Sequence, residues 1–243
     1  MKKSIALALT GLFCATAAHA FEVTGGSVSL GYSGLTDGDL NDSNKTTLGG
    51  SLEFGVSQAF SLQGDLSLSK FGMTEDAAAV LGVSKIDSRS LGMHAIYHAS
   101  ENTSVGAFLG TDRIESTDLN FIGVEAGHQM GQFGLEGYLS RGKLEGITGT
   151  VLGLEGNYAV GEYTTLGLRY DNIDIEGFDS SRLSLTGEIG ATPGFAVTGE
   201  IGNADLEDIG SELFMGIGVR VNFGAKRGAT FRDRSVANLL PGG

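Results

Sequence analysis

The segment LGGSLEFGVSQAFSLQGDLSLS, residues 48–69, decides the fold of this chain. In its first half Leu52 and Phe54 alternate with Ser51 and Glu53, and the second half repeats the alternation. Successive side chains of a β-strand point to opposite faces, so this pattern gives each strand one apolar and one polar face. The segment therefore predicts two antiparallel strands joined by a tight turn.

The same period of two continues along almost the whole chain. About twelve segments show it, most of them roughly 9–12 residues long, which is the length that a tilted strand needs to cross a bilayer. They are 23–32, 46–57, 60–71, 87–99, 103–111, 119–130, 133–141, 149–160, 163–171, 180–190, 195–203 and 212–223. A β-sandwich also alternates, but its outer face carries many Lys and Glu, whereas the polar face here is rich in Gly, Ser and Thr. The pattern predicts an all-β fold, a transmembrane antiparallel up-and-down barrel of about 12 strands, within 10–14.

The connections between these segments alternate in length. Tight turns are expected near 58–59, 100–102, 131–132, 161–162 and 191–194. Longer polar loops are expected near 33–45, 72–86, 112–118, 142–148, 172–179 and 204–211. This alternation is typical of barrels with short periplasmic turns and longer outer loops.

The first twenty residues have the composition of a signal peptide. Lys2 and Lys3 precede a short apolar stretch, and AHA at 18–20 forms a cleavage site. We therefore expect a signal peptide over 1–20 and a barrel over 21–223, with export to the outer membrane.

The composition excludes several other classes of protein. Cys14 is the single cysteine, and Phe13 before it argues against a lipoprotein signal, so the mature chain has no disulfide or thiol site. There are 40 glycines, 2 prolines and no tryptophan. No apolar run after the signal is long enough for a membrane helix, yet the mean hydropathy is +0.07 despite a net charge of −13. The apolar residues must therefore be distributed periodically.

The last predicted strand, LFMGIGVRVNF at 213–223, ends on an aromatic residue. Together with the export signal and the Gly-rich alternating hairpins, it resembles the Gram-negative outer-membrane β-barrels of the porin superfamily. The resemblance implies outer-membrane lipid around the barrel, recognition of the strand ending at Phe223 by the barrel assembly machinery, passive diffusion of small polar solutes, and homo-oligomers. Two features differ: no very long loop is available to fold into the lumen, and about twenty residues follow Phe223.

Charged residues on the polar parity form the candidate site. Residues whose numbers sum to a value set by the turn lie opposite each other in a hairpin. On this basis Glu53 opposes Asp65, Glu125 opposes Glu136, Glu188 opposes Glu200, and Glu155 opposes Arg169. The hypothesis is an acidic belt that lines the pore, flanked by two more arginines. Its members are Glu53, Asp65, Glu125, Glu136, Glu155, Arg169, Arg182, Glu188, Glu200 and Arg220.

An acid-lined lumen favours a porin-like channel with a cation preference. The alternative is a closed structural or adhesive barrel that acts through the loops 33–45 and 72–86. The first of these loops carries Asp37, Asp39 and Asp42, which form either a solvated loop or a weak calcium site.

Catalysis is not expected. His94, His98 and His128 lie in strand segments, and none has the His-x-Ser-Asn context of barrel lipid hydrolases. His94 and His98 share a face but lack an identifiable third metal ligand. Gly-x-Gly spacings are abundant, but none opens a helix, so nucleotide binding is not supported. Neither a cofactor nor a nucleic-acid partner is expected.

The tail 224–243 reverses the charge of the barrel. It carries Lys226, Arg227, Arg232 and Arg234 against Asp233. Two interpretations remain open: a plug docked into the acidic lumen, or a disordered periplasmic segment, and the sequence favours the second.

Overall fold

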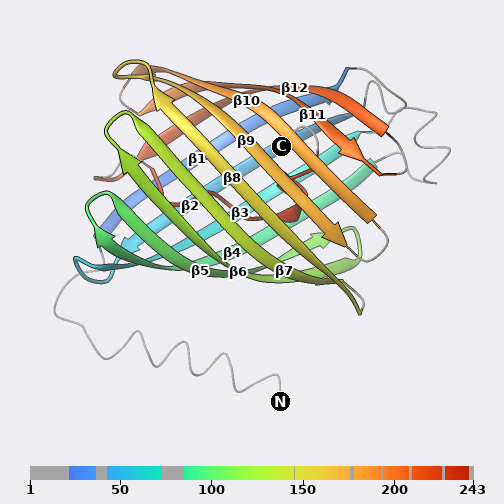
Figure 1. The fold of residues 1–243 in the computed structure, drawn as a ribbon, viewed down its shortest axis with the longest axis horizontal. Helices are drawn as coiled ribbons and strands as arrows, with labels where there is room; N and C mark the ends of the chain where they lie inside the picture. Colours follow the sequence, from blue (N-terminus) through green and yellow to red (C-terminus); the bar gives the residue numbers. More distant parts are fainter. Residues whose placement is uncertain are drawn as a thin grey trace.

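The computed structural model describes residues 22–36, 43–72, 85–144, 146–175, 178–192, 194–207, 210–225 and 228–240. Twelve antiparallel strands form a closed barrel in which each strand pairs with its neighbours in sequence and β1 pairs with β12 (Figure 1). The strands are β1 (Glu22–Leu35), β2 (Asn44–Gly55), β3 (Phe60–Gly72), β4 (Lys85–Ser100), β5 (Thr103–Ile114), β6 (Thr117–Met130), β7 (Phe133–Leu144), β8 (Ile147–Ala159), β9 (Thr164–Ile175), β10 (Phe178–Thr192), β11 (Phe195–Leu206) and β12 (Gly210–Phe223). The predicted fold class and strand number are confirmed.

The two ends of the barrel differ in their connections. At the end where β2 leads into β3, which we call the turn end, all five connections are short, as predicted. At the opposite loop end only two connections are long, between β1 and β2 and between β3 and β4. Longer loops at 112–118, 142–148, 172–179 and 204–211 were a wrong prediction. Polar residues there extend the strands beyond the apolar segments, because a strand that emerges from lipid keeps its ladder but no longer needs apolar side chains.

Hairpin turns at the turn end follow local backbone chemistry. The β6–β7 turn contains Gly131 with φ 63, in the left-handed region that tight hairpin turns require and that glycine adopts without a steric penalty. Such a turn fixes the register between β6 and β7, which pairs Met130 with Phe133.

The two faces of the sheet have opposite polarity. On β3, Leu66 and Leu68 point outward and are 52% and 41% exposed, whereas Asp65 and Ser67 point inward and are each 2% exposed. The same inverted arrangement recurs around the barrel, with exposed Leu, Ile, Val and aromatic side chains on the outer surface. An apolar outer surface and a polar interior suit a barrel surrounded by lipid. Among the described residues, none forms a helix with the length and apolarity of a membrane span.

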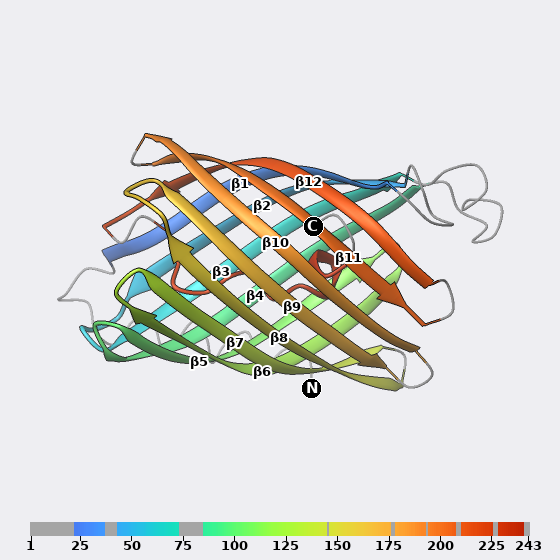
Figure 2. The same ribbon diagram turned by 45° about the horizontal axis from the view of Figure 1, so that its top comes forward.

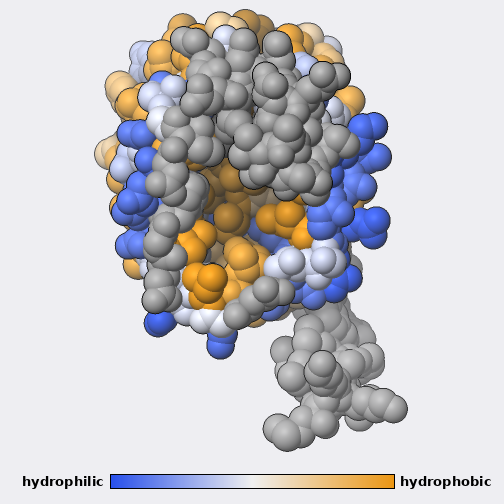
Figure 3. Space-filling view, turned by 90° about the vertical axis from the view of Figure 1, so that its right-hand side faces the viewer, coloured by the Kyte–Doolittle hydropathy of each residue, from blue (hydrophilic) through white to orange (hydrophobic). Residues whose placement is uncertain are grey.

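The interior is polar along most of its length but apolar near the loop end. Inward-facing Phe108, Leu119 and Phe121 form one buried cluster, and Leu35 and Phe214 belong to another. Figure 3 looks into one end of the barrel and shows apolar side chains inside the mouth, with hydrophilic ones around the outer rim. The alternation predicted a polar lining along the whole lumen, and this prediction is wrong near the loop end.

The chain returns into the barrel after β12. Residues 228–240, which we call the C-terminal segment, pass through the interior and include the short 3-10 helix η1 (Val236–Asn238) (Figure 2). The favoured prediction of a disordered tail was therefore wrong for these residues, and the plug alternative describes their position.

Candidate functional site: the lumen and the C-terminal segment

All ten residues predicted to line the pore point into the barrel. Four of them, Glu53, Asp65, Glu125 and Arg182, are buried, with exposed fractions of 0–4%. The other six line a cavity inside the barrel: Glu136, Glu155, Arg169, Glu188, Glu200 and Arg220. The inward placement rests on the period of two, which the structure retains throughout these strands.

The predicted cross-strand pairs are only partly correct. Glu155 lies directly opposite Arg169, as expected, and their Oε2 and Nε atoms are 3.1 Å apart. The three like-charged pairs are each displaced by two residues: Glu53 opposes Gln63, for example, while Asp65 opposes Ser51. A shift of two residues keeps both carboxylates on one face but separates them diagonally, which weakens their repulsion.

One directly opposed acidic pair was missed. Glu136 and Glu155 face each other on β7 and β8, across a loop-end connection, whereas the predicted pairs all lie across turn-end connections. Each of these carboxylates binds an arginine from the C-terminal segment: Arg234 pairs with Glu136, and the Arg232 Nη2 atom lies 3.2 Å from Glu155 Oε1. Basic side chains of the segment thus neutralise this acidic pair in the wall.

The C-terminal segment runs from the turn end toward the loop end. Two residues of β2 show this direction. Glu53, toward the turn end, accepts a hydrogen bond from the Thr230 backbone N–H at 2.7 Å, and Lys45, at the loop end, donates from Nζ to the Ala237 carbonyl at 2.7 Å. The segment therefore spans much of the barrel length.

Side chains of β3 and β5 hold the backbone of the segment. The Gln63 amide donates to the Phe231 carbonyl at 2.8 Å and accepts from the Phe231 N–H at 3.2 Å. Asp112 accepts from the Val236 and Ala237 N–H groups at 2.7 and 3.3 Å. These contacts supply partners for peptide groups that a buried segment would otherwise leave unpaired, at a substantial cost in free energy.

Arg234 of the segment contacts three side chains of the barrel wall. Its Nε atom lies 2.9 Å from Glu125 Oε2, its Nη2 atom pairs with Glu136, and its guanidinium lies 4.3 Å from the ring centroid of Tyr138. Arg234 side-chain exposure is 6%. A planar guanidinium with several N–H donors can bind two carboxylates and stack on an aromatic ring at the same time, which a lysine ammonium cannot do.

His94 connects β3 and β6 beneath this contact. Its Nε2 atom lies 2.6 Å from Asp65 Oδ2, and its Nδ1 atom lies 2.6 Å from Glu125 Oε1. The sequence did not predict these contacts, because Asp65 lies on the neighbouring strand β3 and Glu125 lies on β6, two strands away from His94 on β4. Among the described residues, no group of three or more His, Asp or Glu is arranged to hold a metal ion. The Asp37, Asp39 and Asp42 cluster lies outside the described residues.

Two glycines make room for the segment. A Cβ atom at Gly25 would overlap the Gly228 carbonyl oxygen, and one at Gly106 would lie 3.1 Å from the Phe231 ring. The sequence showed these glycines only as part of the small, polar face. Their close contacts with the segment show why a larger side chain is absent there.

A cavity of about 570 Å³ lies beside the segment. Its wall comes mainly from β7–β12, β1 and β2, with the C-terminal segment on its other side. Four arginines and six carboxylates line it; the arginines are Arg169, Arg220, Arg232 and Arg234, and the carboxylates are Glu136, Glu155, Asp171, Glu188, Glu200 and Asp233.

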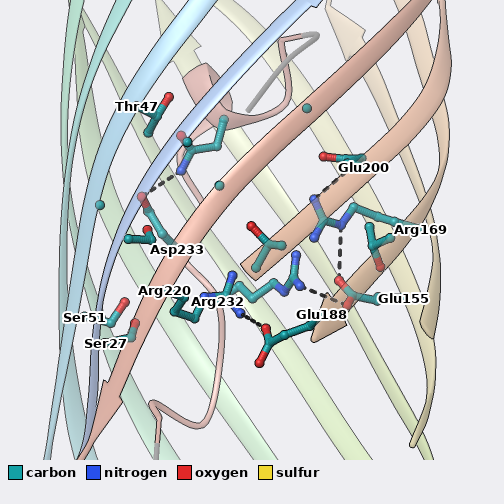
Figure 4. A pocket seen from close by; sticks show the side chains of 18 of the residues that line it. Ser27, Thr47, Ser51, Glu155, Arg169, Glu188, Glu200, Arg220, Arg232 and Asp233 are labelled. Carbon is teal, nitrogen blue, oxygen red and sulfur yellow. Dashed lines mark hydrogen bonds and ion pairs between the residues drawn. The ribbon is translucent and has the colours of Figure 1, made fainter. Parts of the chain in front are cut away.

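Figure 4 shows how these charges alternate around the cavity. Arg169 lies between Glu155 and Glu200, with its Nη1 atom 3.7 Å from Glu200 Oε1. Arg220 and Glu188 form a separate pair at 2.9 Å. The cavity therefore offers both donors and acceptors in fixed positions, with a small excess of acidic groups.

Comparisons with known proteins concern the fold. No family model and no curated protein matches the sequence. Solved structures do match: the KdgM porin covers 81% of this chain and 99% of its own, at 11% identity and a TM-score of 0.61, and it is also known in complex with disordered oligogalacturonate. The COG4313 outer membrane channel from Pseudomonas putida F1 covers 85% of this chain and 97% of its own, at 13% identity and a TM-score of 0.63. The NanC porin matches at 10% identity and a TM-score of 0.59, over 81% of this chain and 98% of that one. The chain thus has the fold of small porin-like outer-membrane β-barrels.

Proposed function

We propose that this chain forms a passive channel of the outer membrane for small hydrophilic solutes and ions, narrowed by its own C-terminal segment. The observation that carries the proposal is the polar cavity of about 570 Å³ enclosed by the barrel wall and the segment. Its volume lies within the range of about 300–1,000 Å³ typical of sites for small molecules. The likeness to small porins supports the same activity.

The proposal includes the cell location and orientation. The leader 1–20 directs export, and the outer apolar surface contacts lipid. The turn end, where β1 begins and β12 ends, faces the periplasm. The C-terminal segment then enters the lumen from the periplasmic side, and the strand ending at Phe223 serves assembly.

We further propose a modest cation preference. The cavity has six carboxylates and four arginines in its lining, and an acidic excess concentrates cations. The preference is modest because most of the belt carboxylates have a basic partner, as in the pairs Glu188–Arg220 and Glu200–Arg182. Cations in the solvent are therefore needed to balance only the remainder.

A planar bilayer experiment tests this function. Purified protein in a potassium chloride gradient is expected to show discrete conductance steps. Its reversal potential is expected to shift from zero toward the equilibrium potential of potassium. Absence of conductance, or a preference for chloride, contradicts the proposal.

A closed structural barrel is the second candidate. It is favoured by the fact that the C-terminal segment and the apolar residues at the loop end, such as Phe108 and Phe121, pack together around Val236. Swelling of liposomes in small sugars separates the two candidates: swelling with the full-length protein supports the channel, and swelling only after removal of the segment supports the closed barrel.

A further inference from the structure

The basic residues of the barrel fall into two separate groups. Four of the 16 lysines and arginines lie outside the described residues. Of the other twelve, six lie inside the barrel: Lys45, Arg169, Arg182, Arg220, Arg232 and Arg234. The remaining six are exposed on the outer surface: Lys70, Lys85, Arg89, Arg113, Arg141 and Lys143. All six of these lie at the loop end of β3, β4, β5 or β7, and we call them the cationic patch.

The strand register brings these side chains together. Arg89 and Arg113 lie directly opposite each other on β4 and β5, and Lys70 on β3 pairs with Asp87, two residues from Arg89. Like charges directly opposite on neighbouring strands repel each other. Asp118 pairs with Arg113 but not with Arg89, so an anion bound at this point would add charge-assisted hydrogen bonds to the Arg89 guanidinium and reduce the remaining repulsion.

Carboxylates on the outer surface of the barrel neutralise only part of the positive charge of the cationic patch. Arg113 forms a two-point ion pair with Asp118, at 2.6 and 2.7 Å. Lys70, Arg89 and Lys143 form no ion pair with any other residue in the described part of the chain. The exposed carboxylates described beside the patch are Asp87, Glu115 and Asp118, so six cations face three anions and the patch keeps a positive excess on a chain whose net charge is −13.

The opposite side of the same rim is acidic. Asp174 and Asp179 lie directly opposite each other on β9 and β10, and Asp205 on β11 and Glu207 beyond it are also exposed. An anionic ligand is consequently attracted to one side of the barrel rather than to the whole rim.

Apolar side chains continue the patch toward the middle of the barrel. A leucine lies two residues from a cation on the same outward face of three strands. The pairs are Lys70 and Leu68 on β3, Arg89 and Leu91 on β4, and Arg141 and Leu139 on β7. Leu68, Leu91 and Leu139 are 41%, 55% and 48% exposed. A charged row above an apolar wall fits an amphiphile with an anionic head and acyl chains, and long basic side chains at such a boundary reach headgroups while their stems stay in lipid.

We propose that the cationic patch binds a phosphorylated glycolipid of the outer leaflet, the lipid A part of lipopolysaccharide. Its phosphates lie at Arg89 and Arg113 and at Arg141 and Lys143, and its acyl chains lie against Leu91 and Leu139. This inference rests on the proposed outer-membrane location with the loop end outward.

Native mass spectrometry of the full-length protein in detergent tests the site. The probes are bisphosphorylated lipid A, the same glycolipid without its phosphates, and phosphatidylglycerol. The wild-type protein is expected to retain bisphosphorylated lipid A in preference to both others. Because each basic residue near an anionic lipid contributes substantially to binding, R89Q/R113Q is expected to weaken retention by roughly tenfold, and R141Q/K143Q to act in the same direction.

The matched control is D179N/D205N on the acidic side of the rim, which is expected to leave retention unchanged. Folding of each variant is verified by its heat-dependent shift on gels, and the conductance of each in bilayers of neutral phosphatidylcholine is expected to equal that of the wild type. Equal retention of all three lipids, or undiminished retention by both folded patch variants, overturns the site. Loss of conductance in every protein tested would instead contradict the proposed channel function.

Discussion

On β5 and β6 the buried carboxylates Asp112 and Glu125 bind the C-terminal segment, and Asp65 on β3 is buried beside them. On β8, β10 and β11, by contrast, Glu155, Glu188 and Glu200 pair with arginines of the wall and line the cavity. We call these regions the packed half and the open half of the lumen. In the packed half the side chains of Asp65 and Glu125 are fully buried, and in the open half those of Glu188 and Arg220 are each 31% exposed. The same alternating strands can thus build a filled interior or an open one, depending on whether a segment supplies the missing partners.

Removing the segment should have the largest effect, because it makes the packed half resemble the open half. A chain ended after Arg227 loses Arg232 and Arg234, which neutralise Glu125, Glu136 and Glu155. We expect single-channel conductance to rise by roughly twofold or more, and potassium preference to increase, because the pore becomes both wider and more acidic. Current recordings with reversal potentials measure both, and an unchanged conductance would show that the segment does not obstruct the pore.

Arg234→Ala should have the next largest effect. Removing one partner of a buried ion pair leaves uncompensated charge and costs about 3–5 kcal/mol, which here weakens docking of the segment and the folded barrel. The free energy of unfolding in urea, followed by the folded fraction on gels, measures the loss.

Arg220→Ala is the matched control in the open half. Its pair with Glu188 is partly exposed, so its removal should cost only about 0–1 kcal/mol. Equal losses for the two variants would mean that the two halves do not differ energetically.

Gly25→Ala tests whether close contact with the wall positions the segment. The added Cβ would overlap the Gly228 carbonyl oxygen, so the start of the segment must shift. Conductance is expected to lie between those of the wild type and the truncated chain. Gly31→Ala on the same strand and face, where a Cβ meets nothing within 4 Å, should behave as the wild type. A similar response to both changes would rule out a specific role for Gly25.

The smallest effects are expected from neutralising single charges in the open half. Glu188→Gln should lower the potassium preference and Arg220→Gln should raise it, each by less than about twofold, because exposed charges are screened by salt. Reversal potentials at low and high ionic strength provide the measurement. Shifts of the same sign for the two variants would show that they act through structure rather than through charge.

Most of the barrel could be predicted, because apolar and polar residues alternate with a period of two along the strands. The alternation of Leu66 and Leu68 with Asp65 and Ser67 fixes which side chains face lipid without any knowledge of their neighbours. The opposition of Glu155 and Arg169 also followed from sequence, because one turn determines it.

The parts that could not be predicted depend on contacts between distant segments. Lys45 and Ala237 are 192 residues apart, and no local pattern links them. A signal was nevertheless present: the basic tail follows an acidic lumen, and its apolar residues around Val236 match inward Phe108 and Leu119. Those inward apolar residues departed from the polar parity and would have pointed to an occupant of the lumen.

The position of the C-terminal segment directly after β12 makes it a ligand joined to its own receptor. Only residues 224–227 separate Phe223 from Gly228, so the segment experiences an effective concentration on the order of millimolar. A peptide with the sequence of 228–240, added to the truncated barrel, would need a comparable concentration to reach the same occupancy. Whether the lumen is filled is therefore settled within each molecule, independently of how many copies the membrane contains.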